Sequence, residues 1–457
     1  MGFDSQIPIK NENGTVGCRR TGRQRTARVR YHGTHHSARL WQTFVQPEAS
    51  VNPVIVIPSY WAESQSHGRL GERGSYDYST PITKPLPELE ICLSSLEQVR
   101  GVDRVIVLLV AAPSCAKSAR ARVNSICRSH MDLNPIVIGD EEASAVQEQC
   151  SGMYAKLQGD PIALRGYGAI RNMGLAVASA FGHDAVVFLD DDEVALNEDY
   201  LIDAVYGLDS LTRQDLPILA KSGCYVDVRS SPYAPVQTEW CERLWSKHVG
   251  FNEMMKRYLT SPTRILRSSY LCGGCCSIHA SAFTRVPFDP YITRGEDLDY
   301  LLDLRANGID VWFDNTWHVR MQPPEEMAST PSIFMQDVYR WFYEYRKLEA
   351  MNGRRDLRTV TPESLMPYPG PWLTPQVRSR VRGTATRRAL VGRDRADYLR
   401  ILRTGCREAD RYAQVATTRY LSFATIWPSI ASSIWNSRYL QRELLSTGSP
   451  AKGSSHE

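Results

Sequence analysis

The sequence predicts an α/β protein whose mostly parallel sheet is flanked by helices, with a helical extension at the C-terminal end. Short runs of apolar, largely β-branched residues recur along the first half of the chain. Most of them are separated by segments in which apolar residues recur at helical spacing. Continuous apolar runs are typical of strands buried on both faces of a parallel sheet, and their alternation with helices indicates a layered α/β domain.

Four such strands and three helices account for the first part of the pattern. The run that begins at Pro53 and ends at Pro58 is bounded by prolines, as expected of a short buried strand. In chain order, we expect strands at residues 53–58, 104–110, 134–138 and 185–189, and helices at residues 86–99, 116–131 and 163–181.

The pattern loosens after Glu193 and becomes helical from about residue 332. A proline-rich stretch at residues 367–375 separates the two long helices of this last part. We expect strands at residues 218–228, 277–283 and 310–313, and helices at 298–307, 333–351 and 395–416.

Three parts follow from this pattern. Residues 1–48 are rich in arginine and poor in apolar anchors, so we expect a basic, flexible arm. An electrostatic contact of this arm with anionic lipid, polymer or nucleic acid is the alternative. Residues 49–330 hold the α/β domain, and residues 331–457 form the helical C-terminal region.

The composition is that of an ordinary globular protein. Of 457 residues, 42% are hydrophobic and 23% charged, which excludes a collagen, a disordered acidic tail and a small disulfide-rich protein. A formal net charge of +4 is nearly neutral for this length, so no nucleic-acid partner is expected.

The cysteines and apolar segments bear on the cellular compartment. Eleven cysteines at irregular positions, with no secretory signal pattern, indicate reduced thiols and a cytoplasmic protein. No run of 18 apolar residues is present, so a spanning helix is not expected. Residues 420–440 carry Trp427 and Trp435 beside arginines, and could either dock on the domain or make a peripheral membrane contact.

Three consecutive carboxylates, Asp190, Asp191 and Asp192, directly follow the strand expected at residues 185–189. Ligands of open α/β sheets bind at the carboxyl ends of strands, which is where these side chains would lie. Like charges packed together are costly unless a cation compensates them, and Mg²⁺ or Mn²⁺ prefers carboxylate oxygens and phosphates. In an extended segment Asp190 and Asp192 point the same way. A solvated acidic turn that caps a helix is the alternative.

A second acidic group, Glu296 and Asp297, opens the helix expected at residues 298–307. Gly295 before it permits close backbone approach, and acidic residues suit a helix N-terminus. The two carboxylates could act only as caps, or one of them could serve as a general base toward an incoming hydroxyl group.

Read together, these motifs resemble a family 2-type glycosyltransferase with the GT-A fold, over roughly residues 52–320. The resemblance rests on six motifs in the order of the family. They are the strand ending in Pro58-Ser59-Tyr60, the helix at 90–96, the segment at 168–175 with Arg171-Asn172, the Asp190-Asp191-Asp192 signature, the Gly273-Gly274 loop, and Glu296-Asp297.

The resemblance implies transfer of a sugar from a nucleotide-diphosphate donor to a hydroxyl-bearing acceptor such as a glycan, lipid or small molecule. Asp190 and Asp192 would bridge a cofactor, Mn²⁺ or Mg²⁺, to the donor diphosphate, with His318 as a further metal ligand or else a packed residue. Asp297, with Glu296 as the alternate, would deprotonate the acceptor for a single displacement with inversion.

The same resemblance implies a set of residues on the donor side. Arg294 would neutralise phosphate there, although a surface ion pair is an equal expectation for it. The implied donor and nucleotide-binding residues are Pro58, Tyr60, Arg171, Asn172, Asp190, Asp191, Gly273, Gly274 and Arg294.

Two departures from the family pattern leave the nucleotide open. The second strand ends at residues 110–113 without the usual carboxylate, and an insertion at residues 62–83 follows the first strand and could supply part of a donor pocket or a lid. A retaining glycosyltransferase on the same fold and a non-catalytic protein that binds a nucleotide sugar or glycan are the alternatives.

Overall fold

The computed structural model describes residues 44–45, 51–64, 76, 78–155, 157, 159–322, 331–391 and 394–449. Trp41–Glu457 form one compact unit, which includes the helical C-terminal region. The expected basic arm lies outside the described residues except for Phe44–Val45 (β1), which pairs with Leu211–Thr212 (β8). Structured chain therefore begins before position 49.

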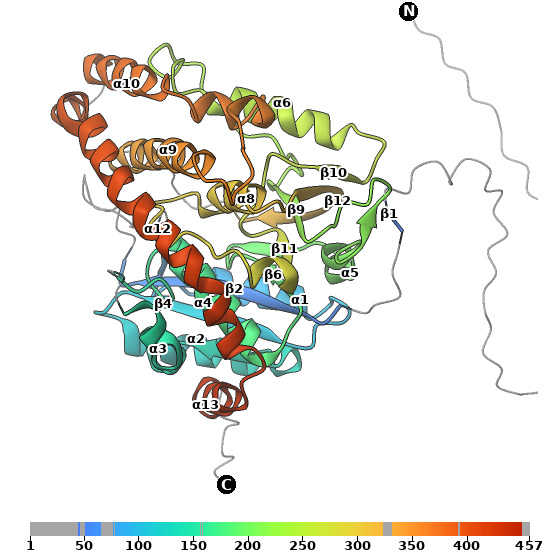
Figure 1. Cartoon of the computed structure of the whole chain (residues 1–457). Helices are drawn as coiled ribbons and strands as arrows, with labels where there is room; N and C mark the ends of the chain where they lie inside the picture. The colour runs from blue at the N-terminus through green and yellow to red at the C-terminus, as the bar shows by residue number, and fades with distance from the viewer. Residues whose placement is uncertain are drawn as a thin grey trace, which may run out of the picture. The chain divides into compact units, whose positions relative to one another are not determined.

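One sheet runs through this unit in the order β10-β12-β9-β11-β6-β2-β4-β5, with β3 beside β2 and β7 beside β12 (Figure 1). From β6 to β5 neighbouring strands are parallel, and these are the four strands that the apolar runs predict. β11 is antiparallel to both its neighbours, so the other half is mixed, and the α/β class is confirmed. The strands are β2 (Pro53–Ala62), β3 (Thr80–Pro81), β4 (Val105–Ala111), β5 (Pro135–Ile138), β6 (Ala185–Phe188), β7 (Glu193–Ala195), β9 (Ala220–Val226), β10 (Ile265–Arg267), β11 (Cys276–His279) and β12 (Val311–Met321).

The strands of the parallel half are buried on both faces. Along β2, Val54 and Val56 belong to one hydrophobic core, whereas Ile55 and Ile57 belong to the other. The first core includes residues of α3 and α4, and the second includes residues of α1 and α2, so helices cover both faces. Double burial explains why these strands are continuous apolar runs in the sequence. The helices are α1 (Glu88–Leu96), α2 (Ala116–Ser129), α3 (Asp140–Tyr154) and α4 (Tyr167–Phe181).

Several helices are absent from the sequence-based expectation: α3, α5, α6, α7, α10 and α13. In α3 the apolar stripe consists of Ala143, Val146, Cys150 and Tyr154, which is narrow and set among acidic residues. The expected strand at 277–283 is wrong in its second half, because the chain leaves β11 and turns into α7. The later helices are α5 (Tyr200–Val205), α6 (Lys247–Leu259), α7 (Ala280–Phe283), α8 (Glu296–Ala306), α9 (Pro331–Asn352), α10 (Val377–Val391), α11 (Arg395–Arg400), α12 (Cys406–Ile434) and α13 (Arg438–Gly448).

Helix α12 packs along α9 and reaches α3 and α4 with a single apolar face (Figure 1). Tyr420, Phe423, Trp427 and Ile430 recur at helical spacing on this face and are buried. The indole Nε1 of Trp427 donates a hydrogen bond to the carbonyl of Phe283 at 2.7 Å. The aromatic face of α12, for which a membrane contact was one expectation, is thus largely buried against other helices of the unit. Within the described part of the chain, no helix has the length and apolar character needed to cross a bilayer.

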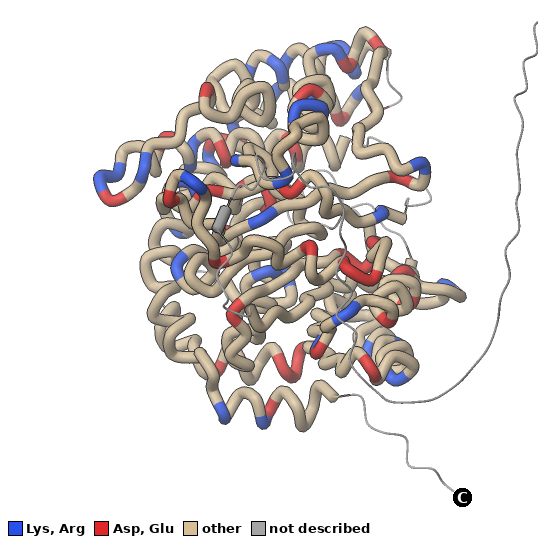
Figure 2. Tube along the Cα trace, turned by 90° about the vertical axis from the view of Figure 1, so that its right-hand side faces the viewer, with Lys and Arg blue, Asp and Glu red and all other residues tan. Residues whose placement is uncertain are grey.

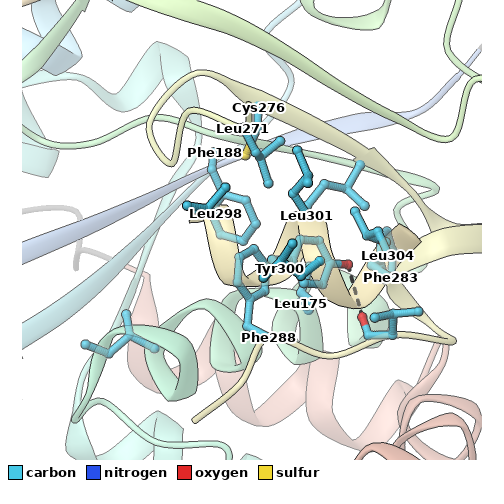
Figure 3. Close-up of a cluster of buried hydrophobic side chains, with 14 of the residues drawn as sticks. Leu175, Phe188, Leu271, Cys276, Phe283, Phe288, Leu298, Tyr300, Leu301 and Leu304 are labelled. Carbon is cyan, nitrogen blue, oxygen red and sulfur yellow. Dashed lines mark hydrogen bonds between the residues drawn. The ribbon is translucent and has the colours of Figure 1, made fainter. Parts of the chain in front are cut away.

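An aromatic cluster fixes α8 behind the sheet (Figure 3). The rings of Phe288 and Tyr300 stack with centroids 3.9 Å apart, and Phe188 at the end of β6 meets Phe288 edge-on at 5.7 Å. The hydroxyl of Tyr300 donates to the carbonyl of Val286 at 3.0 Å. These contacts join the carboxyl end of β6 to α8, which is the geometry on which the site below depends.

A buried lysine ties α9 to the α/β domain. The Nζ of Lys347 lies 2.9 Å from Asp289, 2.6 Å from Asp299 and 2.8 Å from Asp303, and all four side chains are fully buried. Burial raises the pKa of Asp299 to about 6 although Lys347 opposes that shift. One ammonium group therefore compensates three carboxyl groups.

Replacing this lysine is expected to destabilise the whole unit. Lys347→Met would leave three buried carboxyl groups without their cation, so the free energy of unfolding should fall by roughly 3–5 kcal/mol. Lys117→Met, at an exposed position of α2, is the matched control and should change it by less than about 0.5 kcal/mol. Denaturant unfolding followed by circular dichroism measures both, and equal stability of the two variants would contradict this role of Lys347.

Candidate active site

A cleft of about 260 Å³ lies at the carboxyl edge of the parallel half of the sheet. This edge is where open α/β sheets bind ligands. The chain contributes to it from β2 to α9, and its lining residues are Tyr60, Tyr167, Arg171, Asp190, Glu193, Tyr225, Cys272, Gly273, Gly274, Arg294, Gly295, Glu296, Asp297, Met321 and Arg340.

The topology explains why distant segments meet here. Helix α4 precedes β6 and returns the chain to the start of that strand, so the N-terminal half of α4 lies over the carboxyl end of β6. β11 is antiparallel to β6 with Cys276 opposite Phe188. Extending that register by two residues places Gly274 opposite Asp190. Five of the six sequence motifs thereby contribute residues to one cleft, and the helix at 90–96 does not.

Arg171 of α4 is the centre of the cleft. Its Nη2 donates to Asp190 Oδ1 at 2.8 Å and its Nε donates to Glu296 Oε1 at 3.3 Å, with only 4% of the side chain exposed. Its Nη1 is buried and has no hydrogen-bond partner among the described residues. One guanidinium therefore links the end of β6 to the start of α8 and retains a donor for an anionic group.

The three consecutive aspartates point to different surroundings. Asp190 lines the cleft and is one-third exposed. Asp191 is buried and accepts a hydrogen bond from Ser59 Oγ at 2.6 Å, so its carboxylate faces the interior. Burial and the neighbouring Asp190 raise the pKa of Asp192 to about 7.

Glu193, the next residue, lines the cleft and was not expected from the sequence. It is 2% exposed, and its Oε2 accepts a hydrogen bond from the backbone nitrogen of Asp190 at 3.2 Å. Burial raises its pKa well above the usual value, and the charges of Asp190 and Asp192 add to the shift. The only feature of the sequence that could have identified Glu193 is that it is the fourth consecutive acidic residue after β6.

The glycines of the 273–274 loop make room for these side chains. A Cβ at Gly274 would lie 2.0 Å from Glu193 Oε2, and one at Gly273 would lie 3.0 Å from Arg171 Nη2. The sequence resemblance implied that these glycines belong to the donor-binding residues. In the structure, the lack of a Cβ at these two positions leaves room for the side chains of Glu193 and Arg171 in the cleft.

Glu296 and Asp297 open α8 on the opposite side of Arg171. Glu296 is buried, and burial raises its pKa to about 7 although Arg171 opposes the shift. Asp297 is partly exposed and lines the cleft, so of the two it is the carboxylate open to a ligand. Gly295 has φ +70°, and a Cβ there would lie 1.9 Å from Arg340 Cζ, which brings α9 to the cleft.

Three tyrosines form one side of the cleft. Tyr60 and Tyr167 line it, and Tyr76 packs against both rings at centroid distances of 4.5 and 5.3 Å. The Tyr76 hydroxyl accepts a hydrogen bond from the backbone nitrogen of Gly166 at 3.0 Å. The insertion at 62–83 thus supports the cleft wall through Tyr76, while residues 65–75 and 77 lie outside the described residues.

The carboxylates fit a divalent cation that is shared with a ligand. No group of three or more His, Cys, Asp or Glu side chains in the described ranges is arranged to hold a metal by itself. Mg²⁺ and Mn²⁺ do not need one, since one or two carboxylates plus substrate phosphates are a common ligand set. The raised pKa values of Asp192 and Glu193 reflect burial and like charges that a cation would offset.

Five of the expected residues do not line the cleft. Pro58 is buried within β2, opposite Leu108. Asn172 is fully buried and serves the backbone: its Nδ2 donates to the carbonyls of Pro161 and Phe288 at 3.0 and 2.9 Å. Asp191, Asp192 and His318 do not line the cleft either, although Asp192 is partly exposed and stands two residues after Asp190 in the chain.

His318 is separated from the aspartates along β12. The backbone nitrogen of Gln322 donates to the carbonyl of Asp192 at 2.7 Å, and His318 lies four residues earlier, or about 13 Å along the strand. Arg294 lines the cleft, where the resemblance expected it to neutralise phosphate. It also pairs with Asp337 at 3.2 Å, which is the ion pair that was the other expectation.

Cysteines contribute small buried groups. Cys272 lines the cleft, and Cys275 and Cys276 are buried beside it. All ten described cysteines are free, in agreement with the expected reduced thiols.

Comparison with known proteins found similarity to solved structures, at low identity. No family model matches the chain, and no curated protein matches it. It is similar to the solved structure of a mannosyltransferase from Pyrobaculum calidifontis in complex with GDP-Man and Mn²⁺, at 14% identity and TM-score 0.40, covering 87% of this chain and 90% of that one. It is also similar to glucosyl-3-phosphoglycerate synthase from Mycobacterium tuberculosis in complex with Mn²⁺ and UDP-Glc, at 12% identity and TM-score 0.35, covering 69% and 87%. These TM-scores are low, so the chemistry of this chain rests on its own residues.

The packing around Glu193 can be tested with two glycine variants. Gly274→Ala should lower the free energy of unfolding by roughly 1–3 kcal/mol, because its Cβ would overlap the Glu193 carboxylate. Gly152→Ala is the matched control: it lies in α3 with open space around it and should be neutral or stabilising by about 0.5–1 kcal/mol. If both alanines had the same effect in denaturant unfolding, the placement of Glu193 would be wrong.

Proposed function

We propose that this protein is a metal-dependent glycosyltransferase that moves a sugar from a nucleotide-diphosphate donor to a hydroxyl group of an acceptor, with inversion. The observation that carries the proposal is the Arg171 constellation. Asp190 and Glu296 flank one buried guanidinium, a spare Nη1 remains on it, and the partly exposed Asp297 follows on α8.

The charges of the cleft suit a diphosphate that arrives with a cation. Asp190, Glu193, Glu296 and Asp297 face three arginines in the cleft, and burial favours the neutral forms of Glu193 and Glu296. The arginines would attract a diphosphate, and a divalent cation held by Asp190 and the neighbouring Asp192 would offset the carboxylates and stabilise the charge that grows on the leaving nucleotide. Arg171 orients Asp190 for this role and offers Nη1 to a phosphate oxygen.

Asp297 is suited to act as the general base. In the proposed step its carboxylate accepts the proton of the acceptor hydroxyl as that oxygen bonds to the anomeric carbon of the sugar. The bond from this carbon to the diphosphate breaks, and its electron pair leaves with the nucleotide. Attack from the face opposite the leaving group inverts the anomeric centre.

Tyr60 and Tyr167 offer flat, apolar surfaces at the same edge of the sheet. Such surfaces suit the base or ribose of a nucleotide through stacking. With no carboxylate at the end of β4, the tyrosines are the residues we assign to hold the nucleoside.

One prediction of the proposed function concerns binding of the donor. With Mn²⁺ or Mg²⁺, one nucleoside diphosphate or its sugar should bind the wild-type protein in calorimetry, and EDTA should abolish that binding. Asp190→Asn and Asp192→Asn should weaken it by at least about tenfold, since each removes a charged metal ligand. Asp132→Asn, at an exposed position outside the cleft, is the control and should bind normally. Metal-independent binding, or equal affinity in all variants, would contradict the proposed metal site.

Another prediction of the proposed function concerns the general base, Asp297. Asp297→Asn should lower kcat by roughly 10²–10⁴-fold and leave donor affinity unchanged, because an amide cannot accept the acceptor proton. Product anomers resolved by NMR should be inverted relative to the donor. Retention of configuration would replace this mechanism by a retaining one. Donor binding without turnover over a broad acceptor panel would favour a non-catalytic binding protein.

A further inference from the structure

A second cavity, of about 390 Å³, lies apart from the cleft, and the two share no lining residue. It is bordered by α6, β10, the C-terminal end of α8 and the segment at residues 358–367. Arg305, near the end of α8, lies eight residues after Asp297, or about 12 Å along the helix. The volume of the cavity is within the range of cavities that hold small molecules.

The charged side chains that line this cavity are all basic: Arg257, Arg267, Arg305 and Arg358. Over most of the described chain, basic and acidic residues are interspersed (Figure 2). Arg257 pairs with Glu253 and Arg267 pairs with Asp310, and both of these carboxylates lie outside the lining. Within the described ranges, neither Arg305 nor Arg358 has an ion-pair partner.

Arg305 is the buried member of the set. It is 7% exposed, and its Nη1 and Nη2 donate to the carbonyls of Ser364 and Ser268 at 3.3 and 2.6 Å. Its Nε is buried and lacks a hydrogen-bond partner among the described residues. Burial lowers the pKa of its guanidinium; the positive charges of Arg267 and Arg358 add to that shift, and the Asp310 carboxylate opposes it.

Such a cluster is costly unless an anion compensates it. The hydrogen bonds of Arg305 go to carbonyls, and the nearby Asp310 carboxylate pairs with Arg267, so this buried charge loses hydration without an ion-pair partner of its own. Arginine forks match the oxygens of a phosphate group, and a phosphate monoester carries close to two negative charges at neutral pH. The two arginines without an ion-pair partner, Arg305 and Arg358, therefore match one phosphate monoester in charge.

We propose that this arginine cavity binds the phosphate group of a small phosphorylated molecule. Arg305 and Arg358 contact the phosphate, Arg267 adds charge from the rim, and the hydroxyls of Ser269 and Thr359 are available to the remainder of the ligand. The site does not depend on the glycosyltransferase proposal, because no residue of the cleft takes part in it.

The test is isothermal titration calorimetry at constant ionic strength, with EDTA and without nucleotide or metal. Inorganic phosphate and glucose 6-phosphate are the probes, and glucose is the matched neutral ligand. Both phosphates should bind the wild-type protein saturably, whereas glucose should not bind. Tighter binding of glucose 6-phosphate than of phosphate would place the organic part in the cavity, and equal binding would limit recognition to the phosphate group.

Two exposed arginines three residues apart provide matched variants. Arg358→Ala should weaken glucose 6-phosphate binding by at least about tenfold, the effect of one charged hydrogen bond, and Arg358→Glu should abolish it. Arg355→Ala and Arg355→Glu make the same changes in net charge outside the cavity and should bind as wild type does. Absence of phosphate binding to the wild type, or equal loss at both positions, would overturn the proposal. Donor binding at the cleft should be unaffected in all four variants, which separates this outcome from failure of the proposed function.

Discussion

Arg171 supplies a permanent positive charge to a group of carboxylates that the fold brings together at one edge of the sheet. Because it is 4% exposed, its cost of burial is offset chiefly by the two carboxylates that it contacts, Asp190 and Glu296. Those contacts fix the end of β6 relative to the start of α8. The positions of the expected metal ligand and of the expected base therefore both follow from one guanidinium.

The chain makes space around that charge with glycines. Gly273 leaves room for Arg171, Gly274 for Glu193 and Gly295 for Arg340. In each case a Cβ would meet a charged group belonging to the protein itself. The polar wall of the cleft can thus form without widening the sheet, and Cys276 keeps its place in β11 directly behind it.

Sequence patterns predicted the parallel half of the sheet because each of its strands is a continuous apolar run, as in Val105–Ala111. They missed α3, whose buried stripe is narrow, and α10, whose surface is dominated by arginine. At the site, Asp190, Glu296 and Asp297 were expected because consecutive acidic residues stand out in a sequence. Glu193 and Arg340 were not, since the contacts that place them there, with Gly274 and Gly295, come from distant parts of the chain. Asn172 belongs to a cleft-forming motif but serves the backbone, a distinction that only hydrogen-bond partners reveal.

Helix α9 carries two charged side chains that the α/β domain cannot do without. Lys347 compensates the aspartates behind α8, and Arg340 fills the space left by Gly295 at the cleft. A recombination event at the boundary near residue 330 would separate these partners, leaving uncompensated charge on both fragments. The helical region is therefore not a module that evolution could exchange freely. Any replacement would have to keep a cation at the positions of Arg340 and Lys347.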